Sequence, residues 1–154
     1  MPRRKNKLLV EQLDNKIFYL KKAKDLHLPT EGWVHTIRTA LSMSLRQLGI
    51  RLGISPQGVK VMEEREKEGS ITINTLQEVA KALNMKLVYG FVPLEDSVQE
   101  MINKRALELA REIVMRTSMS MKLEDQENSK KRIEKAIKER AEDLISETPK
   151  LLWR

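Results

Sequence analysis

The chain has 154 residues, of which 40% are hydrophobic and 33% charged, and its formal net charge is +7. That length allows one compact core with helical extensions, and the lack of cysteine excludes disulfides and thiolate metal sites. No stretch has the length and apolarity of a membrane span or of a signal region, so we expect a soluble, cytoplasmic protein without a membrane partner.

The positive charge is concentrated in the first 93 residues. Residues 1–31 carry 8 Lys/Arg against 4 Asp/Glu, and residues 32–93 carry 8 against 5. Residues 94–154 are balanced, with 13 of each. A polyanion would therefore bind the first part of the chain before the last.

The first predicted element is an amphipathic helix over residues 8–26. Apolar residues recur at helical spacing from Leu9 to Leu20. Pro29 and Gly32 then interrupt the helical pattern. The basic residues at the chain start are expected to form a flexible arm along a duplex or into its minor groove: Arg3, Arg4, Lys5 and Lys7. We therefore treat residues 1–31 as one segment, a basic arm and helix.

Residues 32–93 form the second predicted segment and consist of short helices. Ser44 with Gln47, and Thr75 with Glu78, have the spacing of capping boxes, so each pair predicts a helix start. The stretch NMKLVYGFVP, residues 84–93, is rich in β-branched and aromatic residues. It predicts one short extended strand, which would need a partner.

Residues 94–154 predict a helical extension for dimerisation or partner binding. Ser97 with Glu100 has the capping spacing again, and the apolar residues after it recur at steps of three and four. A polar break, KLEDQENSKKR, precedes a last helix from Ile133 to Leu144. Trp33 and Trp153 are expected to be packing anchors. The predicted fold class is mainly all-α with one short extended segment.

Residues 44–66, SLRQLGIRLGISPQGVKVMEERE, are typical of two short helices across a tight turn. Gly53 tolerates the positive φ that ends a helix, and Ile54 can fill the corner. Ser55 can cap the second helix, with Pro56 at its first position. Such a pair places its second helix in a DNA major groove. The alternative is an ordinary helix end that has no role in DNA binding.

Four residues on the open face of this second helix are the candidate base readers. Gln57 can pair with adenine through two hydrogen bonds, and Lys60 can reach guanine or a phosphate. Gly58 and Val61 share this face. Contacts to the DNA backbone are expected from hydroxyls and from basic side chains of the first helix and the arm: Ser44, Arg46, Arg51, Ser55, Arg3, Arg4 and Lys5.

The stretch SLRQLGIRLGISPQGVKVMEE resembles the Cro/C1-type helix-turn-helix of xenobiotic-response-element repressors, which implies a small helical bundle. Together with EGWVHTIRTALSMSLRQLGIRLGIS, GSITINTLQEVAKALNMKLVYGFVP, MSMKLEDQ and the terminal LLWR, it makes nearly the whole chain similar to the family called mobile mystery protein A. Leu45 and Lys60 depart from the repressor pattern, where Gln and Ser are frequent. The resemblance therefore implies the fold and the groove geometry, and not the contacts at these two positions.

The family resemblance also implies a bacterial origin and a partner. Members are encoded beside a Fic-domain protein, mobile mystery protein B, and Fic domains commonly transfer AMP from ATP to protein hydroxyls. Such enzymes are often restrained by a helix with Ser/Thr-x-x-x-Glu followed by Gly or Asn. Ser120 and Glu124 have this spacing here, with Asp125 in the last place. Glu124 would pair with an arginine of the partner; the alternative is a solvated glutamate at a helix end.

These patterns predict a sequence-specific DNA-binding regulator that is nucleoid-associated when bound. The simplest form is an autorepressor that binds an inverted repeat of double-stranded DNA as a homodimer. Either KLVYGFVP or the helix after Ser97 would supply the twofold contact. The alternative function is an antitoxin-like protein whose C-terminal helices bind and inhibit a Fic-domain partner. An enzyme, a cofactor and a small-molecule substrate are not expected, nor is a metal site, because His27 and His35 are isolated.

Overall fold

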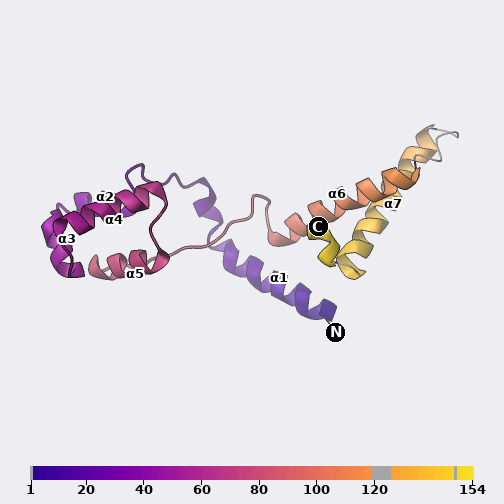
Figure 1. Ribbon diagram of the computed structural model, residues 1–154. Helices are drawn as coiled ribbons and strands as arrows, with labels where there is room; N and C mark the ends of the chain where they lie inside the picture. The colour runs from indigo at the N-terminus through magenta and orange to yellow at the C-terminus, as the bar shows by residue number, and fades with distance from the viewer. Residues whose placement is uncertain (1, 119–125, 148) are drawn as a thin grey trace. The chain divides into compact units, whose positions relative to one another are not determined.

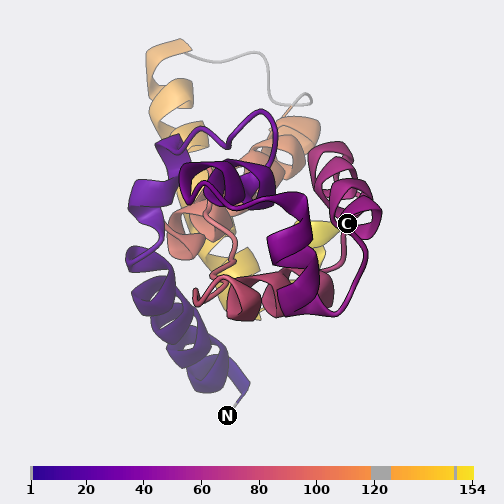
Figure 2. The same cartoon turned by 90° about the vertical axis from the view of Figure 1, so that its left-hand side faces the viewer.

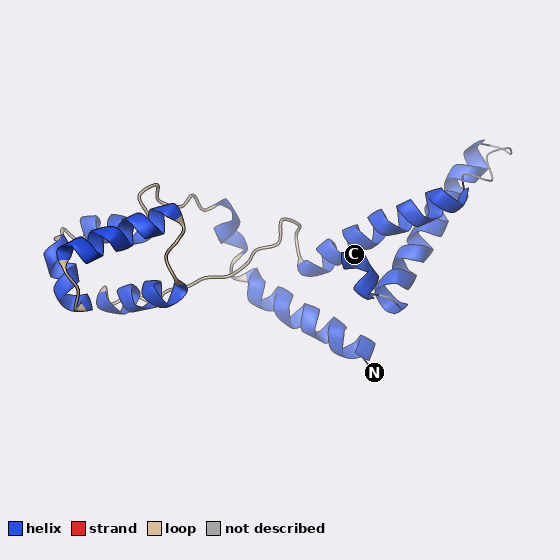
Figure 3. Ribbon diagram, viewed as in Figure 1, coloured by secondary structure: helices blue, strands red, loops and turns tan. Residues whose placement is uncertain are grey.

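The computed structural model describes residues 2–118, 126–147 and 149–154, and within them the regular structure is entirely helical (Figures 1 and 3). The prediction of a mainly α-helical chain is confirmed for these residues. In chain order the described helices are α1 (Pro2–Phe18), the 3-10 helix η1 (Lys21–Asp25), α2 (Trp33–Ala40), α3 (Leu45–Leu52), α4 (Pro56–Glu68), α5 (Ile73–Ala82), α6 (Val98–Ser118), α7 (Gln126–Glu147) and the 3-10 helix η2 (Pro149–Trp153).

The chain divides into two compact units. One is Lys22–Gly90, here called the α2–α5 unit. The other consists of Met1–Lys21 with Phe91–Arg154, here called the α6–α7 unit. The boundary at residues 90 and 91 lies close to the predicted one at 93 and 94. The predicted separate segment 1–31 is not seen, because α1 packs with the C-terminal helices.

The α2–α5 unit is a bundle of four short helices around one apolar core (Figures 1 and 2). The buried core residues come from all four helices and from the C-terminal end of α5: Val34, Leu48, Val59, Met62, Val79 and Leu83. Leu48 and Val59 have no exposed surface at all. Burial of a side chain of this size contributes about 1.5–3 kcal/mol, so this core fixes how α3 and α4 lie against each other.

The α6–α7 unit is a helical hairpin in which α6 and α7 lie side by side (Figure 1). Ala106, Ala110 and Ala141 are buried where the two helices meet, and their small side chains allow close packing. Leu144 and Leu152 are buried in the same cluster. Leu152 belongs to η2, which therefore ties the C-terminus to the hairpin.

Helix α1 caps the N-terminus of α6. The carboxylate of Asp14 accepts hydrogen bonds from the backbone nitrogens of Val98 at 2.7 Å and Gln99 at 3.3 Å. The Ser97 hydroxyl accepts one from the nitrogen of Glu100 at 3.0 Å, as the capping spacing predicted. A negative charge here also interacts favourably with the helix dipole.

The N-terminal prediction of an arm followed by a helix over residues 8–26 is wrong in its limits. Helix α1 begins at Pro2, so Arg3, Arg4 and Lys5 lie in a helix and not in a flexible arm. Proline suits the first position of a helix, and arginine, lysine and leucine favour its continuation. The helix ends at Phe18, and residues 21–25 form the 3-10 turn η1.

Three other predicted features also need correction. Residues 85–93 form no strand, because no second strand among the described residues can pair with them. Helix α5 begins at Ile73 and not at Thr75, and Thr72 is its cap. The predicted polar break ends before Gln126, because residues 126–132 already belong to α7; glutamine, glutamate, lysine and arginine are good helix formers.

The two tryptophans are not the buried anchors that we expected. Trp33 is 43% exposed and Trp153 is 58% exposed, whereas Leu152 is only 1% exposed and anchors the C-terminus. In the part of the chain that the structure describes, no helix combines the length and the apolar character that a membrane span requires.

Candidate nucleic-acid interface

Helix α3 begins with a complete capping box. The Ser44 hydroxyl accepts a hydrogen bond from the Gln47 nitrogen at 3.2 Å, and the Gln47 side-chain oxygen accepts one from the Ser44 nitrogen at 2.7 Å. Two backbone donors that would otherwise lack partners are thereby satisfied. This predicted helix start is confirmed.

The turn between α3 and α4 consists of residues 53–55. Gly53 has φ 70° and ψ 29°, the left-handed conformation that glycine adopts without strain. The nitrogen of Ile54 then donates to the carbonyl oxygen of Gly49 at 2.9 Å, which closes the helix end. A Cβ atom on Gly49 would lie 2.6 Å from the carbonyl oxygen of Ile54. The tight turn therefore depends on glycine at both positions.

Helix α4 begins with its first turn open to solvent. The Ser55 hydroxyl accepts from the Gly58 nitrogen at 3.0 Å, and Pro56 occupies the first helical position. Val59 and Met62 are buried in the core, as their spacing predicted. Gln57 and Lys60 are consequently exposed, while Gly58 and Val61 are half-buried. The predicted orientation of this helix is confirmed.

A groove of about 450 Å³ runs between α4 and the start of α5. It is lined by three of the four candidate base readers, by core-side apolar residues, and by several polar residues that sequence reasoning missed: Gln57, Gly58, Val61, Ile54, Met62, Ile71, Arg65, Ser70, Thr72 and Thr75. Lys60 is exposed but is not among the lining residues. The signal for the second wall was the hydroxyl-rich stretch SITINT, which we interpreted only as a helix start.

The candidate contacts to a DNA backbone are not all in one place. Ser44, Arg46 and Ser55 are exposed in the α2–α5 unit. Arg51 is also exposed, but its Nη1 donates to the carbonyl oxygen of Ala82 at 3.0 Å, so its guanidinium links α3 to the end of α5. The remaining three, Arg3, Arg4 and Lys5, belong to α1 in the other unit.

The candidate partner-inhibition residues, Ser120 and Glu124, lie outside the described residues. The binding of a Fic-domain protein through these residues therefore stays a prediction. Co-purification with any Fic-domain protein encoded beside its gene would test it.

The second half of α4 is anchored to α2 by a buried ion pair. Glu63 is only 7% exposed, and its two carboxylate oxygens accept hydrogen bonds from Arg38 Nε at 2.6 Å and Arg38 Nη2 at 3.1 Å. His35 Nδ1 lies 3.0 Å from the same carboxylate. Arg38 Nη1 also donates to the carbonyl oxygen of Met43 at 2.9 Å. Every polar group of this pair therefore has a defined partner, as burial of charge requires.

Protonation of Glu63 is governed by the same contacts. Burial raises the pKa of its carboxyl, but the hydrogen bonds and charges of Arg38 and His35 outweigh burial and hold the pKa below its ordinary value of 4.5. The hydrogen bond to Glu63 likewise raises the pKa of Arg38. Both groups are therefore charged at neutral pH.

The depressed pKa of Glu63 predicts acid sensitivity. The folded pKa lies below the ordinary value, so the stabilisation is present above about pH 4.5 and is lost as the pH falls through the folded pKa. We expect Glu63→Gln to lose stability at neutral pH and to show a shallower further loss between about pH 5 and pH 3 than the wild type. Urea unfolding at several pH values measures both, with Glu64→Gln as the exposed neighbour control. If the free energy of unfolding changed equally with pH in all three proteins, the prediction would be contradicted.

A second glutamate of α4 caps helix α2. The carboxylate of Glu66 accepts from the backbone nitrogens of Trp33 at 2.8 Å and Val34 at 2.9 Å. Gly32 has φ 85° and lacks a capping side chain, and a Cβ atom there would lie 2.9 Å from Glu66 Oε2. The glycine therefore makes room for a cap that comes from α4. The first turn of α4 thus stays open to solvent, while its last turns hold it to α2 through Glu63 and Glu66.

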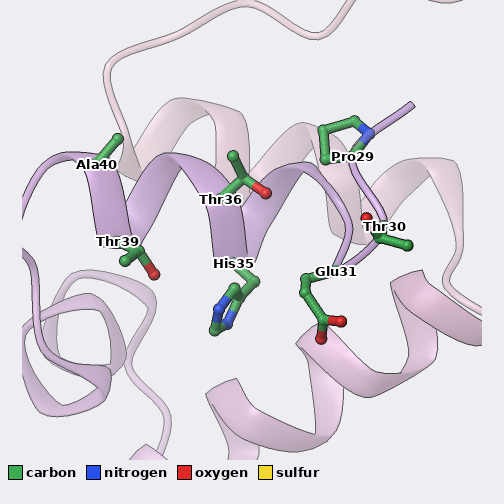
Figure 4. A pocket seen from close by; sticks show the side chains of 7 residues that line it. All are labelled: Pro29, Thr30, Glu31, His35, Thr36, Thr39 and Ala40. Carbon is green, nitrogen blue, oxygen red and sulfur yellow. The ribbon is translucent and has the colours of Figure 1, made fainter. Parts of the chain in front are cut away.

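The other large hollow in this unit lies along α2 and has a volume of about 500 Å³ (Figure 4). Its lining residues are Pro29, Thr30, Glu31, His35, Thr36, Thr39 and Ala40. Its two titratable side chains are already engaged: Glu31 with Lys67 Nζ at 2.9 Å, and His35 with Glu63. No set of three potential metal ligands occurs in the parts of the chain that are described. We therefore regard the groove between α4 and α5 as the candidate site.

No family model matches this chain, and neither a curated protein nor a solved structure does. The function proposed next therefore depends on the residues and geometry of the chain and on the resemblance of its sequence motifs.

Proposed function

We propose that the protein is a sequence-specific DNA-binding regulator in which α3 and α4 form a Cro/C1-type helix-turn-helix. Helix α4 is the recognition helix and enters the major groove with its first turn. The observation that supports this most strongly is the division of α4: Gln57 and Lys60 are exposed on its open first half, while Glu63 and Glu66 anchor its second half to α2.

The charges of α4 are divided in the same way. In the first seven residues, PQGVKVM, the only charged side chain is Lys60. The remaining six, EEREKE, hold all the acidic residues of the helix. An approach by the first half therefore brings a positive charge to the phosphates and keeps the carboxylates at the distant end. The net excess of basic residues in positions 32–93 acts in the same direction.

The two walls of the groove suit different parts of a duplex. Gln57 can read an adenine edge, and Gly58 lets a base or sugar approach the backbone of α4. Arg65 of α4 can bind a phosphate. On the other wall, the Thr72 hydroxyl accepts from the Thr75 nitrogen at 3.1 Å and pairs with the Thr75 hydroxyl at 2.8 Å, so it can donate to a phosphate when the Thr75 hydroxyl is the donor of that pair. Base readout is thus assigned to the first turns of α4, and backbone contacts to Arg65 and to the start of α5.

The regulator acts as a homodimer on an inverted repeat, most simply in its own promoter region. Two recognition helices related by a twofold axis reach successive major grooves when they lie about 34 Å apart. The sequence resemblance to the mobile mystery protein A family agrees with this role, because that family carries a repressor-type helix-turn-helix.

The test is the variant Gln57→Ala/Lys60→Ala. We expect it to lose discrimination between the upstream DNA of its own gene and scrambled DNA, since each good base contact is worth about 1–3 kcal/mol. Weak, salt-dependent binding should remain, because the other basic and hydroxyl side chains still contact phosphates. Fluorescence anisotropy across a salt series measures both quantities.

The matched control is Gln77→Ala/Lys81→Ala, which removes the same residue types from exposed positions on α5. It should leave discrimination unchanged. Discrimination that survives in Gln57→Ala/Lys60→Ala would show that other residues read the bases. Weak binding of the wild type to every DNA alike would contradict the proposed function itself.

A further inference from the structure

The connector from α5 to α6 carries large apolar side chains in water. We call residues 86–96, KLVYGFVPLED, the strip. Within it Val88 is 68% exposed, Tyr89 64% and Phe91 90%. Single exposed apolar residues are common on proteins, but three within four positions form a patch of the kind that another surface covers.

The strip has the composition of a strand but forms none in the described structure. Four of its residues are β-branched or aromatic: Val88, Tyr89, Phe91 and Val92. A strand needs a neighbour to receive its backbone hydrogen bonds. The described parts of this chain contain no strand that could be this neighbour. A second copy of the chain carries an identical strip and can supply this neighbour.

The charges of the strip favour such pairing in one direction. Lys86 stands at one end, Glu95 and Asp96 stand at the other, and no charged residue lies between them. In a twofold-symmetric antiparallel pair centred on Phe91, Lys86 of each copy faces Asp96 of the other. A parallel pair would set like charges beside each other, which is unfavourable. Glu95 already accepts a hydrogen bond from Lys104 at 2.6 Å, whereas the neighbouring Asp96 is exposed. Asp96 is therefore the carboxylate that is available to Lys86 of a second copy.

The exposed area is sufficient for a modest dimer. An aromatic side chain buries about 150–250 Å², so Tyr89 and Phe91 can remove roughly 300 Å² per chain from water. Val88 adds roughly 100 Å². Two chains would bury about 800 Å² through these side chains, and the flanking residues bring the total near the roughly 1,000 Å² of a specific interface.

We propose that the strip pairs with the same strip of a second copy as a two-stranded antiparallel ribbon, and that this ribbon is the dimer contact. The inference deepens the proposed function and rests on it in one respect, because an inverted repeat requires two copies. The pairing itself needs no DNA, so it can be measured independently of operator binding.

The first experiment is sedimentation equilibrium of the full chain without DNA. We expect the wild type to dimerise and Val88→Lys/Phe91→Lys to raise the dissociation constant at least about a hundredfold, because four lysines would be brought together in one ribbon. The control is Leu28→Lys, which places a charge on a 73% exposed leucine elsewhere and should leave the dimer unchanged.

Charge exchange tests the antiparallel direction. Lys86→Glu alone should weaken the dimer, and adding Glu95→Lys and Asp96→Lys should restore it, because the pairs are then reversed but still complementary. Circular dichroism confirms that α6, which begins two residues after Asp96, stays helical in these variants. A general hydrophobic association would not show this rescue.

A cysteine gives a direct distance test, because the chain has none of its own. Phe91→Cys lies on the proposed axis and faces the same residue of the second copy, so oxidation should link two chains through a disulfide, which requires Cα atoms about 4.4–6.8 Å apart. Leu28→Cys should not link them under the same conditions. Linking of both variants at the same rate would contradict the pairing.

The outcomes separate this inference from the proposed function. A wild type that sediments as a monomer at every concentration, or a dimer that Val88→Lys/Phe91→Lys leaves intact, overturns the ribbon. Either result is compatible with operator discrimination, which depends on Gln57 and Lys60. A dimer that behaves as expected but binds all DNA with the same affinity would support the ribbon and contradict the proposed function.

Discussion

Glu63→Ala is expected to lower the free energy of unfolding by about 3–5 kcal/mol, because Arg38 would be left partly buried without its counter-charge. The guanidinium of Arg38 makes two hydrogen bonds to the Glu63 carboxylate, and the Glu63 side chain is buried. Removal of one partner also leaves a cavity between α2 and α4. Urea unfolding followed by circular dichroism measures the change in unfolding free energy.

Two further variants distinguish the buried pair from a general effect of removing charge from α4. Glu64→Ala removes the exposed neighbour and should change stability by less than about 0.5 kcal/mol. The double variant Arg38→Met/Glu63→Leu replaces the pair by apolar groups of similar size, and it should recover most of the loss. A loss in Glu63→Ala no larger than that in Glu64→Ala would show that the ion pair does not hold α4 to α2.

Gly49→Ala is expected to destabilise the protein by about 1–3 kcal/mol, the usual effect of overpacking a tight contact. The added Cβ would lie 2.6 Å from the carbonyl oxygen of Ile54, and a backbone atom of the turn cannot move away as a flexible side chain could. The turn would shift, and with it the start of α4. Thermal and urea unfolding measure the stability, and operator binding measures the displacement of the recognition helix.

Gly58→Ala is the matched control because it makes the same change in the next helix. A Cβ there meets only ordinary contacts, the nearest being the Ser55 hydroxyl oxygen at 3.4 Å. Alanine is a better helix former than glycine, so we expect a gain of about 0.5–1 kcal/mol. Two glycine-to-alanine changes should thus have opposite signs. Stabilisation by both would contradict the close approach at Gly49.

The two halves of α4 connect these stability predictions to the proposed function. Glu63 and Glu66 bind groups of α2, so they determine the direction in which the first turn of α4 points. Loss of this anchor should therefore weaken operator discrimination even though Gln57 and Lys60 remain in the sequence. A buried ion pair is weak evidence for stability in itself, but it can determine a unique packing arrangement.

The sequence by itself determined the local structure around α3 and α4. Ser44, Gln47, Gly53 and Ser55 act on backbone groups within a few residues, so the helix limits and the tight turn could be predicted. The periodic burial of Val59 and Met62 then indicated which side chains of α4 are exposed. These predictions succeeded because capping and helical periodicity are interactions of short range.

Only the tertiary structure decided the features that join distant parts of the chain. Glu63 meets Arg38 across 25 residues, and Asp14 caps α6 across 84, and no local pattern indicates such partners. The groove that Gln57 of α4 lines together with Thr72, the cap of α5, and the packing of α1 with the C-terminal hairpin are of the same kind. The expected strand failed for the complementary reason: the residue preference is local, but a strand exists only where a second segment receives its hydrogen bonds.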